Sequence, residues 1–420
     1  MLFIYGALPV GGVETFFLRM AKKRFNKDRY TAIFLLSKPD ESDSRILLEI
    51  KKYADVLFLA DLFKLGPIVS RKFPLLAPLK KSALENVMEK VSQIHAFHGF
   101  HALLGYRFSK ITKKRVPITI GFYHYIRYLW GGDNVPYHEK ISRKFIFQYL
   151  PRRSLMFFSE DNRNLYEKMK GIDLHESNTF RLGVIDSKKV ILKENLEKPL
   201  KICAVGRLVD FKTYNIYMLE VIKKLLEDGL KVHFDIYGDG PLRSLLERKI
   251  IEMKLSKNIS LKGTLSYSSF DATVAQYDLF IGSGTAIIQA AGLGVPSIAA
   301  VENVDVPKTY GFFSDICHHE YNLKGLNLPL FDVIKLIYDY VLMADKDRWS
   351  LKKDHVDSAE NFTNEFCEEN IDALKNIQMP DHAFKFSRLI FEVSRKIDSV
   401  RLKLDRRHPM LTQFKDFPNS

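Results

Sequence analysis

The chain has 420 residues, of which 46% are hydrophobic and 27% are charged. This composition excludes a disordered or fibrous chain, and the length predicts two domains of ordinary size with an appendage. The three cysteines, Cys203, Cys317 and Cys367, lie far apart in the sequence. They argue against a disulfide framework and a clustered metal site, and they predict a reducing compartment, by default the cytoplasm.

The first residues predict a strand that runs into a glycine-rich loop and then a helix. Residues 1–8 are apolar without a basic leader and continue into Pro9 and Val10, which argues against a signal peptide. Gly11 and Gly12 are candidate substrate-binding positions, because glycine lets a backbone approach a ligand and a helix N-terminus presents free amides to negative charge. An ordinary tight turn is the alternative.

The N-terminal half contains five further apolar runs that are separated by helix-like or loop-like spans. They cover residues 32–36, 56–59, 93–97, 118–122 and 155–159. Short apolar runs in such alternation predict a parallel sheet with crossover helices.

Histidines lie close to two of these runs. His95, His98 and His101 recur at spacings of three, and His124 follows the run at 118–122. No cysteine or carboxylate lies nearby in the sequence, so a zinc site is not favoured. His98 and His124 are candidates for hydrogen bonding to a sugar, and satisfied structural histidines are the alternative.

A polar, Lys- and Glu-rich segment at 186–199 predicts the linker between two domains. Beyond it the pattern restarts, with expected strands at 201–205, 232–237, 259–261, 279–281 and 297–300 and expected helices at 214–228 and 242–253. This predicts a second doubly wound unit. Such sheets bind ligands at the carboxyl ends of their strands, so two facing sheets are expected to share one cleft.

The stretch 279–301 has no charged residue and is long enough for a membrane span. Its glycines and Pro296 would interrupt a single helix. We therefore expect a strand, a loop, a buried helix and a strand within a domain.

Two cations follow the first strand of the second unit. Arg207 and Lys212 lie in the segment Val205-Gly-Arg-Leu-Val-Asp-Phe-Lys212. Arginine binds phosphate oxygens in a fork and lysine supplies a point charge, so the pair would stabilise a departing diphosphate as its charge grows. A solvated loop is the alternative.

A second glycine-rich loop precedes the expected buried helix. The backbone amides at Gly284 and Thr285 and the Thr285 hydroxyl suit a phosphate or sugar hydroxyls, and Gln289 follows on the same helix. Close packing of a helix of small residues explains the pattern equally well. Asp345-Lys346-Asp347 resembles an acidic metal motif in letters only, because it lies in a helical region.

Positive charge is concentrated in the first half. Residues 1–195 hold 34 Lys and Arg against 19 Asp and Glu, whereas the remaining 225 hold 30 against 31. We therefore expect the N-terminal domain to meet an anionic partner. The basic clusters 22–24, 113–115, 143–144 and 152–153 are interleaved with aromatic residues. They fit nucleic acid or an anionic membrane, and the lack of a nucleic-acid module favours the membrane.

From about residue 332 onward the signal is helical, and residues 384–404 form a basic amphipathic stretch. A helix packed across the domains is favoured there over a membrane or partner role.

These features together resemble the retaining GT-B glycosyltransferases of family 4, also called group 1, over roughly residues 1–345. The resemblance is carried by the loop Gly11-Gly-Val-Glu14, by His98-Gly99 and His124, by the segment from Val205 to Lys212, by Tyr237 to Leu242, by Gly263-Thr264-Leu265 and by the segment 294–298.

The resemblance implies an α/β GT-B fold with two Rossmann-like domains facing across a cleft. It places an acceptor-binding domain at 1–190, a nucleotide-sugar-binding domain at 196–345 and a helical extension at 346–420. One alternative for this extension is that it returns to pack on the first domain. It implies sugar transfer from a nucleotide diphosphate sugar, with retention of configuration and without a required metal. Together with the charge pattern and the cysteines, it leads us to expect a hexose-type sugar, a saccharide or lipid-linked acceptor and no cofactor. We expect a role in surface polysaccharide, lipopolysaccharide or glycolipid synthesis at the cytoplasmic face of the membrane.

The site residues follow from the same resemblance. Arg207, Lys212 and His124 are expected to be catalytic. The positions expected to bind substrate are Gly11, Gly12, His98, Gly263, Leu265, Gly284, Thr285 and Gln289.

One departure from the family pattern stands in this region. The family has two glutamates eight positions apart, where this chain has Ile281 and Gln289. A non-catalytic GT-B subunit that binds a saccharide or a partner is therefore the alternative function. A nucleotide-sugar epimerase, which needs ionisable groups in the cleft, is a third.

Overall fold

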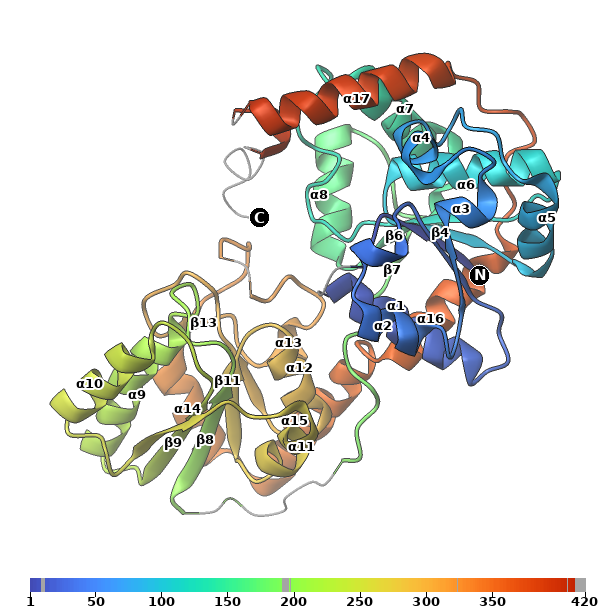
Figure 1. The fold of residues 1–420 in the computed structure, drawn as a ribbon. Coiled ribbons are helices and arrows are strands. Elements are labelled where there is room, and N and C mark those ends of the chain that lie inside the picture. The colour runs from blue at the N-terminus through green and yellow to red at the C-terminus, as the bar shows by residue number, and fades with distance from the viewer. Residues whose placement is uncertain (9–11, 191–195, 197, 323, 406, 412–420) are drawn as a thin grey trace. The chain divides into compact units, whose positions relative to one another are not determined.

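The computed structural model describes residues 1–8, 12–190, 196, 198–322, 324–405 and 407–411 (Figure 1). Contacts between Cα atoms divide the chain into two units. Of the described residues, unit 1 contains those within Met1–Gly183 and those from Asn364 to Leu411, and unit 2 contains those within Val184–Thr363.

Unit 1 is built on a parallel sheet of seven strands in the order β3-β2-β1-β4-β5-β6-β7. The strands are β1 (Leu2–Tyr5), β2 (Ala32–Leu35), β3 (Asp55–Phe58), β4 (Ile94–Ala96), β5 (Ile118–Gly121), β6 (Leu155–Phe157) and β7 (Asn178–Thr179). Five of these strands, β1, β2, β4, β5 and β6, are mainly apolar and almost entirely buried, as parallel strands covered by helices must be. The strand order reverses between β1 and β4, and such a reversal point is where sheets of this kind bind ligands.

The helices of unit 1 come from both ends of the chain. They are α1 (Gly12–Phe25), α2 (Ser44–Ile50), α3 (Leu59–Leu62), α4 (Pro67–Lys72), α5 (Lys81–Lys90), α6 (Gly99–Thr112), α7 (Tyr137–Lys144), α8 (Glu160–Lys170), α16 (Asn364–Ala373) and α17 (Arg388–Leu404). Two apolar cores lie within the unit, and Phe391 of α17 belongs to one while Cys367 and Ile371 of α16 belong to the other.

Unit 2 is a parallel sheet of five strands in the order β10-β9-β8-β11-β12. The strands are β8 (Leu200–Val205), β9 (Val232–Tyr237), β10 (Ile259–Gly263), β11 (Leu279–Gly282) and β12 (Ser297–Ala299), with a small antiparallel pair β13 (Lys308–Thr309) and β14 (Phe331–Asp332). The helices are α9 (Tyr214–Glu227), α10 (Arg243–Glu252), α11 (Tyr267–Val274), α12 (Thr285–Gly292), α13 (Phe313–Ile316), α14 (Val333–Leu342) and α15 (Asp345–Glu360). The order reverses between β8 and β11.

The structure confirms the two doubly wound parallel sheets that the sequence predicts. It also confirms the reading of residues 279–301, which form β11, α12 and β12. Among the described residues, no helix has both the length and the apolarity needed to cross a membrane. The short strand β7 was not predicted, because its residues Asn178 and Thr179 are polar and carry no apolar run.

The chain passes between the units at positions that differ from the predicted boundaries. The first passage lies at Gly183 and Val184, before the expected linker. Ile185 already packs in the core of unit 2, and Lys188 forms an ion pair of 2.8 Å with Asp271 of α11. Helix α15, expected in the extension, belongs to unit 2, where His355 accepts a hydrogen bond of 2.9 Å from the Ser297 backbone N–H.

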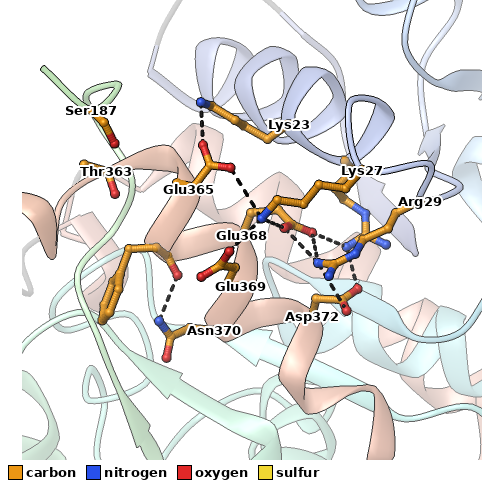
Figure 2. A network of polar contacts seen from close by, with 12 residues as sticks. Lys23, Lys27, Arg29, Ser187, Thr363, Glu365, Glu368, Glu369, Asn370 and Asp372 are labelled. Atoms are coloured by element: carbon orange, nitrogen blue, oxygen red, sulfur yellow. Dashed lines mark hydrogen bonds and ion pairs between the residues drawn. The ribbon is translucent and has the colours of Figure 1, made fainter. Parts of the chain in front are cut away.

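Helix α16 is held to unit 1 by a network of ion pairs. Figure 2 shows Lys23, Lys27 and Arg29 beside the acidic side chains of this helix. At its centre the Arg24 guanidinium, 2% exposed, donates to Glu368 at 2.7 Å and to Asp372 at 2.8 Å. Arg29 binds the same two carboxylates. Residues more than 300 positions apart in sequence therefore complete one α/β unit.

Candidate functional site

In unit 2 the loops after β8 and β11 leave neighbouring strands at the reversal point of the sheet. Leu279 of β11 pairs with Ile202 of β8. The loop after β8 carries Arg207 and Lys212, and the loop after β11 carries Gly284 and Thr285. The predicted cations and the predicted glycine loop thus emerge at the same edge, where open α/β sheets bind ligands.

The loops after β8 and β9 are joined by backbone hydrogen bonds beyond the ends of their strands, and glycines allow the two backbones to lie this close. The Gly206 N–H donates to the Tyr237 carbonyl at 2.9 Å, and the Leu208 N–H donates to the Asp239 carbonyl at 3.0 Å. A Cβ on Gly238 would lie 1.8 Å from the Gly206 carbonyl oxygen, and its φ of +149° is one that other residues rarely adopt. The loop that carries Arg207 is therefore fixed by its neighbour, the loop after β9.

Lys212 folds back over the start of its own loop. Its Nζ lies 2.9 Å from the position that a Cβ of Gly206 would occupy. Burial lowers the pKa of Lys212 and the nearby Arg207 lowers it further, whereas the carboxylate of Glu302 opposes both effects. Arg207 itself is exposed. The two predicted cations are thus close enough for the charge of Arg207 to affect Lys212. Lys212 is half-buried, and Arg207 is open to solvent.

Glu302, which the sequence reasoning missed, connects these loops. Its carboxylate accepts a hydrogen bond of 2.9 Å from the Ser283 hydroxyl in the loop after β11. The adjoining residues hold the loop after β8, because the Asn303 N–H donates to Phe211 O at 2.9 Å and Thr213 Oγ1 donates to Val304 O at 2.6 Å. A carboxylate directly after the last apolar run, at 302, was the available sequence signal.

Helix α12 begins at this edge with Gly284 as its N-cap, at a φ of +66° that favours glycine. Thr285 is exposed at the helix start, and Gln289 is buried one turn further on. In the described part of the chain, the Gln289 Oε1 atom has no hydrogen-bond partner, and the same holds for the buried hydroxyl of Tyr214. A buried acceptor without a partner is costly unless a ligand or water satisfies it.

Gly263 and Leu265 lie at the end of β10, on the far side of β9. Gly263 has a φ of +74°, and its carbonyl accepts the Gly238 N–H at 2.8 Å. Leu265 is half-buried against the apolar core of unit 2. Gly263 is thus joined to the Arg207 loop through the loop after β9.

In unit 1, His98 and His124 line one pocket at the carboxyl ends of β4 and β5, together with Tyr5, Phe97 and Arg127. Burial, with Arg127 close by, lowers the pKa of His98 to about 3 and also lowers that of His124. Both imidazoles are thus neutral near pH 7 and able to donate and accept hydrogen bonds. Arg127, which also lies 3.6 Å from a Glu139 oxygen, was not singled out from the sequence, because it stands alone between aromatic residues.

The remaining predicted residues of unit 1 are placed differently. Gly12 begins α1, and Gly11 lies outside the described residues. His95 is fully buried and satisfied by Thr119 at 2.9 Å and by Tyr123 at 2.8 Å, so it is a structural histidine. Within the described ranges no group of three His, Cys, Asp or Glu side chains is arranged to hold a metal ion.

Several arginines of the predicted basic clusters bind other groups of this protein, whereas the sequence analysis expected them to bind an external anionic partner. Arg24 is buried against α16, and Arg115 binds Asp381 at 2.6 Å. Arg143 donates to the carbonyls of Trp130 and Gly132, and Arg152 donates to Phe147 O. The aromatic residues Tyr128, Trp130, Phe145 and Phe147 lie in the interior and are not arrayed on the surface. Sequence alone did not reveal these partners, because several of them are hundreds of residues away.

Known proteins agree with this architecture. Residues 186–305 match the family described as glycosyl transferases group 1. No curated protein matches the chain by sequence. Among solved structures, a glycosyltransferase from Rickettsia africae superposes with a TM-score of 0.57 at 16% identity, covering 89% of this chain and 98% of that one.

Two further structures show the same likeness. The lipopolysaccharide outer core galactosyltransferase WaaB has a TM-score of 0.53 at 15% identity, with 89% of this chain and 99% of that chain covered. HepE of Anabaena in complex with UDP has a TM-score of 0.54 at 13% identity, with 89% and 98% covered. The fold is therefore that of the GT-B glycosyltransferases, and within it residues 186–305 match the group 1 glycosyltransferase family.

Proposed function

We propose that this protein transfers a hexose-type sugar from a nucleotide diphosphate sugar to a saccharide or lipid-linked acceptor, with retention of anomeric configuration and without a metal. The observation that carries the proposal is the pair Arg207 and Lys212 on the β8 loop, at the reversal point of a sheet that matches group 1 glycosyltransferases. The relative HepE was solved with UDP and with UDP-glucose, which supports a nucleotide sugar as donor.

In the proposed reaction, Arg207 and Lys212 stabilise the leaving group, and residues at the start of α12 position the donor. The bond between the sugar and the diphosphate breaks, and negative charge grows on the departing phosphate oxygens. Arg207 binds those oxygens as a fork and Lys212 as a point charge, so both stabilise the transition state more than the ground state. The acceptor hydroxyl oxygen forms the new bond to the anomeric carbon on the face that the diphosphate leaves, and the departing phosphate takes the proton of that hydroxyl. Backbone amides at Gly284 and Thr285, and the acceptor oxygen of Gln289, position the donor.

In this proposal the pocket of unit 1 that contains the two neutral histidines serves the acceptor. His98 and His124 exchange hydrogen bonds with sugar hydroxyls, for which a neutral imidazole supplies one donor and one acceptor. Gly12, which begins α1, allows a close approach of the backbone to the ligand. We place the reaction in surface polysaccharide, lipopolysaccharide or glycolipid synthesis, at the cytoplasmic face of the membrane.

The test is turnover of a panel of nucleotide sugars by wild type, Arg207→Ala and Lys212→Ala. Each substitution removes one stabilising group, so kcat is expected to fall about 100- to 1,000-fold, or about 2.7 to 4 kcal/mol. Arg248→Ala, an exposed cation of α10 in the same unit, is the matched control and keeps wild-type turnover. Near-normal transfer by both loop variants would refute the assigned roles.

The neutral Gln289 in place of the family glutamate motivates one alternative, a non-catalytic saccharide-binding or partner subunit. Isothermal titration with nucleoside diphosphates separates the two functions. Binding to a nucleoside diphosphate supports the transferase, and absence of binding to all of them supports the subunit.

A further inference from the structure

Helix α17 has an inner face that packs on unit 1. It lies against α7, as Figure 1 shows at the red end of the chain. Phe391 and Glu392 are fully buried, and the Glu392 carboxylate accepts the Leu75 backbone N–H at 2.8 Å. Asp398 accepts a hydrogen bond of 3.0 Å from the buried His408. Both acidic residues of this helix therefore point inward and are engaged.

The opposite face of α17 is apolar and exposed. Its side chains are between 45% and 79% exposed, and they are Leu389, Ile390, Val393, Ile397, Val400 and Leu404. Their spacing of three and four places them on one stripe along the whole helix. A soluble surface rarely keeps such a contiguous apolar stripe without a partner to cover it.

Cations border this stripe. At 100° per residue, Lys396 and Lys403 fall on one side of it and Arg401 on the other. Helix α4 lies next to α17, because Arg395 of α17 donates to the Lys72 carbonyl at 2.8 Å. It brings Arg71 and Lys72 to the side of the stripe that carries Lys396. Ile68 and Val69 of α4 are also exposed. Burial lowers the pKa of Lys396, the cations Arg395, Lys72 and Arg71 lower it further, and Glu392 opposes them.

We propose that the outward face of α17 is the surface by which this protein docks on an anionic lipid bilayer, with its apolar stripe in the headgroup and acyl boundary and its cations against lipid phosphates. Amphipathic helices that lie in a membrane interface have an apolar face flanked by lysine and arginine, and their acidic residues lie elsewhere. A second copy of the chain fits this face less well, because two such stripes packed together would bring Lys396, Arg401 and Lys403 against like charges.

This inference rests on the proposed function, which places the protein at the membrane. It assigns the membrane contact to α17, where the sequence analysis had assigned it to the four basic clusters. The docked helix would hold unit 1 at the bilayer, where a lipid-linked acceptor is within reach. Docking does not require Arg207 or Lys212, so vesicle binding and sugar transfer fail independently of each other.

The experiment is cosedimentation of the full chain with vesicles of equal parts phosphatidylglycerol and phosphatidylcholine. Wild type binds, and the double variant Val393→Glu with Ile397→Glu binds at least about tenfold more weakly, because two charges enter the centre of the apolar stripe. The control carries Ile251→Glu and Leu342→Glu, two exposed apolar residues of unit 2, and binds as wild type does. Circular dichroism and the unfolding temperature confirm that both variants fold.

A second arm measures the charge contribution. Arg401→Gln with Lys403→Gln weakens binding to the same vesicles by roughly fivefold per cation removed, and added salt has the same effect on wild type. Binding to pure phosphatidylcholine vesicles does not change.

Three results would overturn the proposal. The first is no binding of wild type to the anionic vesicles at low salt, and the second is equal binding of wild type and the Val393/Ile397 variant. The third is a wild-type dimer in light scattering that this variant dissociates, which would assign the face to a second copy.

Discussion

The carboxyl edges of the two sheets carry different side chains, although both sheets are parallel and both reverse their strand order once. In unit 2 the edge carries Arg207, Lys212 and Glu302 on glycine-rich loops that are tied by backbone hydrogen bonds. In unit 1 the corresponding edge carries His98 and His124, both held neutral among aromatic rings. One fold design can thus carry different chemistry at its two edges, because the side chains after the strands differ. Under the proposed function, the cations of unit 2 bind the diphosphate and the histidines of unit 1 bind hydroxyl groups of the acceptor.

The two units also differ in how the chain completes them. Unit 2 is one continuous segment, whereas unit 1 needs α16 and α17 from the end of the chain. Each unit contains one tryptophan, Trp130 in unit 1 and Trp349 in α15 of unit 2. Single-tryptophan variants therefore let fluorescence report the stability of each unit separately, and the predictions below use them.

The largest effect is expected from Arg24→Ala. The substitution leaves Glu368 and Asp372 buried without their central partner. Loss of one member of a buried ion pair costs about 3–5 kcal/mol, so urea unfolding followed by Trp130 should shift by that amount while the Trp349 signal stays unchanged.

Arg45→Ala is the control for this prediction. Its ion pair with Asp43 lies on the surface, with the arginine 86% exposed, so the substitution should leave the unfolding of unit 1 almost unchanged. Equal shifts for Arg24→Ala and Arg45→Ala would show that α16 does not hold unit 1 together.

In unit 2 the next largest effect is expected from Gly238→Ala. The added Cβ meets the backbone oxygen of Gly206, so the loop must move and unfolding reported by Trp349 should become easier by about 3 kcal/mol. Donor binding should fall with it, because the displaced loop fixes Arg207. Gly229→Ala has a similar left-handed backbone, with φ of +88° and open space around it, and should cost only about 1 kcal/mol.

The sequence predicted these elements where the physical signal is local. Apolar runs such as 118–122 and 297–300 identify buried parallel strands, because both of their faces are covered. The glycines and cations after β8 and β11 were likewise recognisable from their position after a run. Glu302 and Arg127 were missed because each is a single charge whose partners, Ser283 and Glu139, are defined only by folding.

The basic clusters show the opposite error. Charge asymmetry along the chain predicted an external anionic partner for residues 22–24, but Arg24 finds its anions in α16, more than 340 residues later. A count of charges in one half of the sequence does not reveal an ion pair that crosses to the other half. The same limit applies to α17, whose amphipathic pattern was visible while the outward direction of its apolar stripe was not.

Acid should destabilise unit 1 more steeply than unit 2. Burial lowers the pKa of His95 to about 3 and that of His101 well below its ordinary value, whereas unit 2 contains the fully buried His355, with a pKa of about 4. The folded chain keeps these imidazoles neutral while the unfolded chain takes up protons below about pH 6.5. Their stabilising contribution is therefore complete above that pH and is lost as pH falls toward the folded-state values.

Each such histidine contributes about 1.4 kcal/mol per pH unit within this window. Unfolding curves at several pH values between about 6.5 and 4.5 should thus show a larger slope for Trp130 than for Trp349, and His355→Gln should flatten only the slope of unit 2. Parallel slopes for both tryptophans would contradict the difference in buried histidines.

The smallest effect concerns Gln289, and it separates a ligand-binding role from a packing role. Gln289→Leu keeps the shape of the side chain and removes the buried Oε1 atom, which has no partner among the described residues. If that oxygen accepts a hydroxyl of the donor, the affinity for UDP should fall about threefold to tenfold, the loss of one hydrogen bond of about 0.5–1.5 kcal/mol. The stability of unit 2 should stay the same or rise, because an unsatisfied polar atom has been removed. Isothermal titration and the Trp349 unfolding curve measure the two quantities on one variant. A fall in stability with unchanged UDP affinity would make Gln289 a packing residue of α12, and the donor would then be positioned by the loops after β8 and β11 alone.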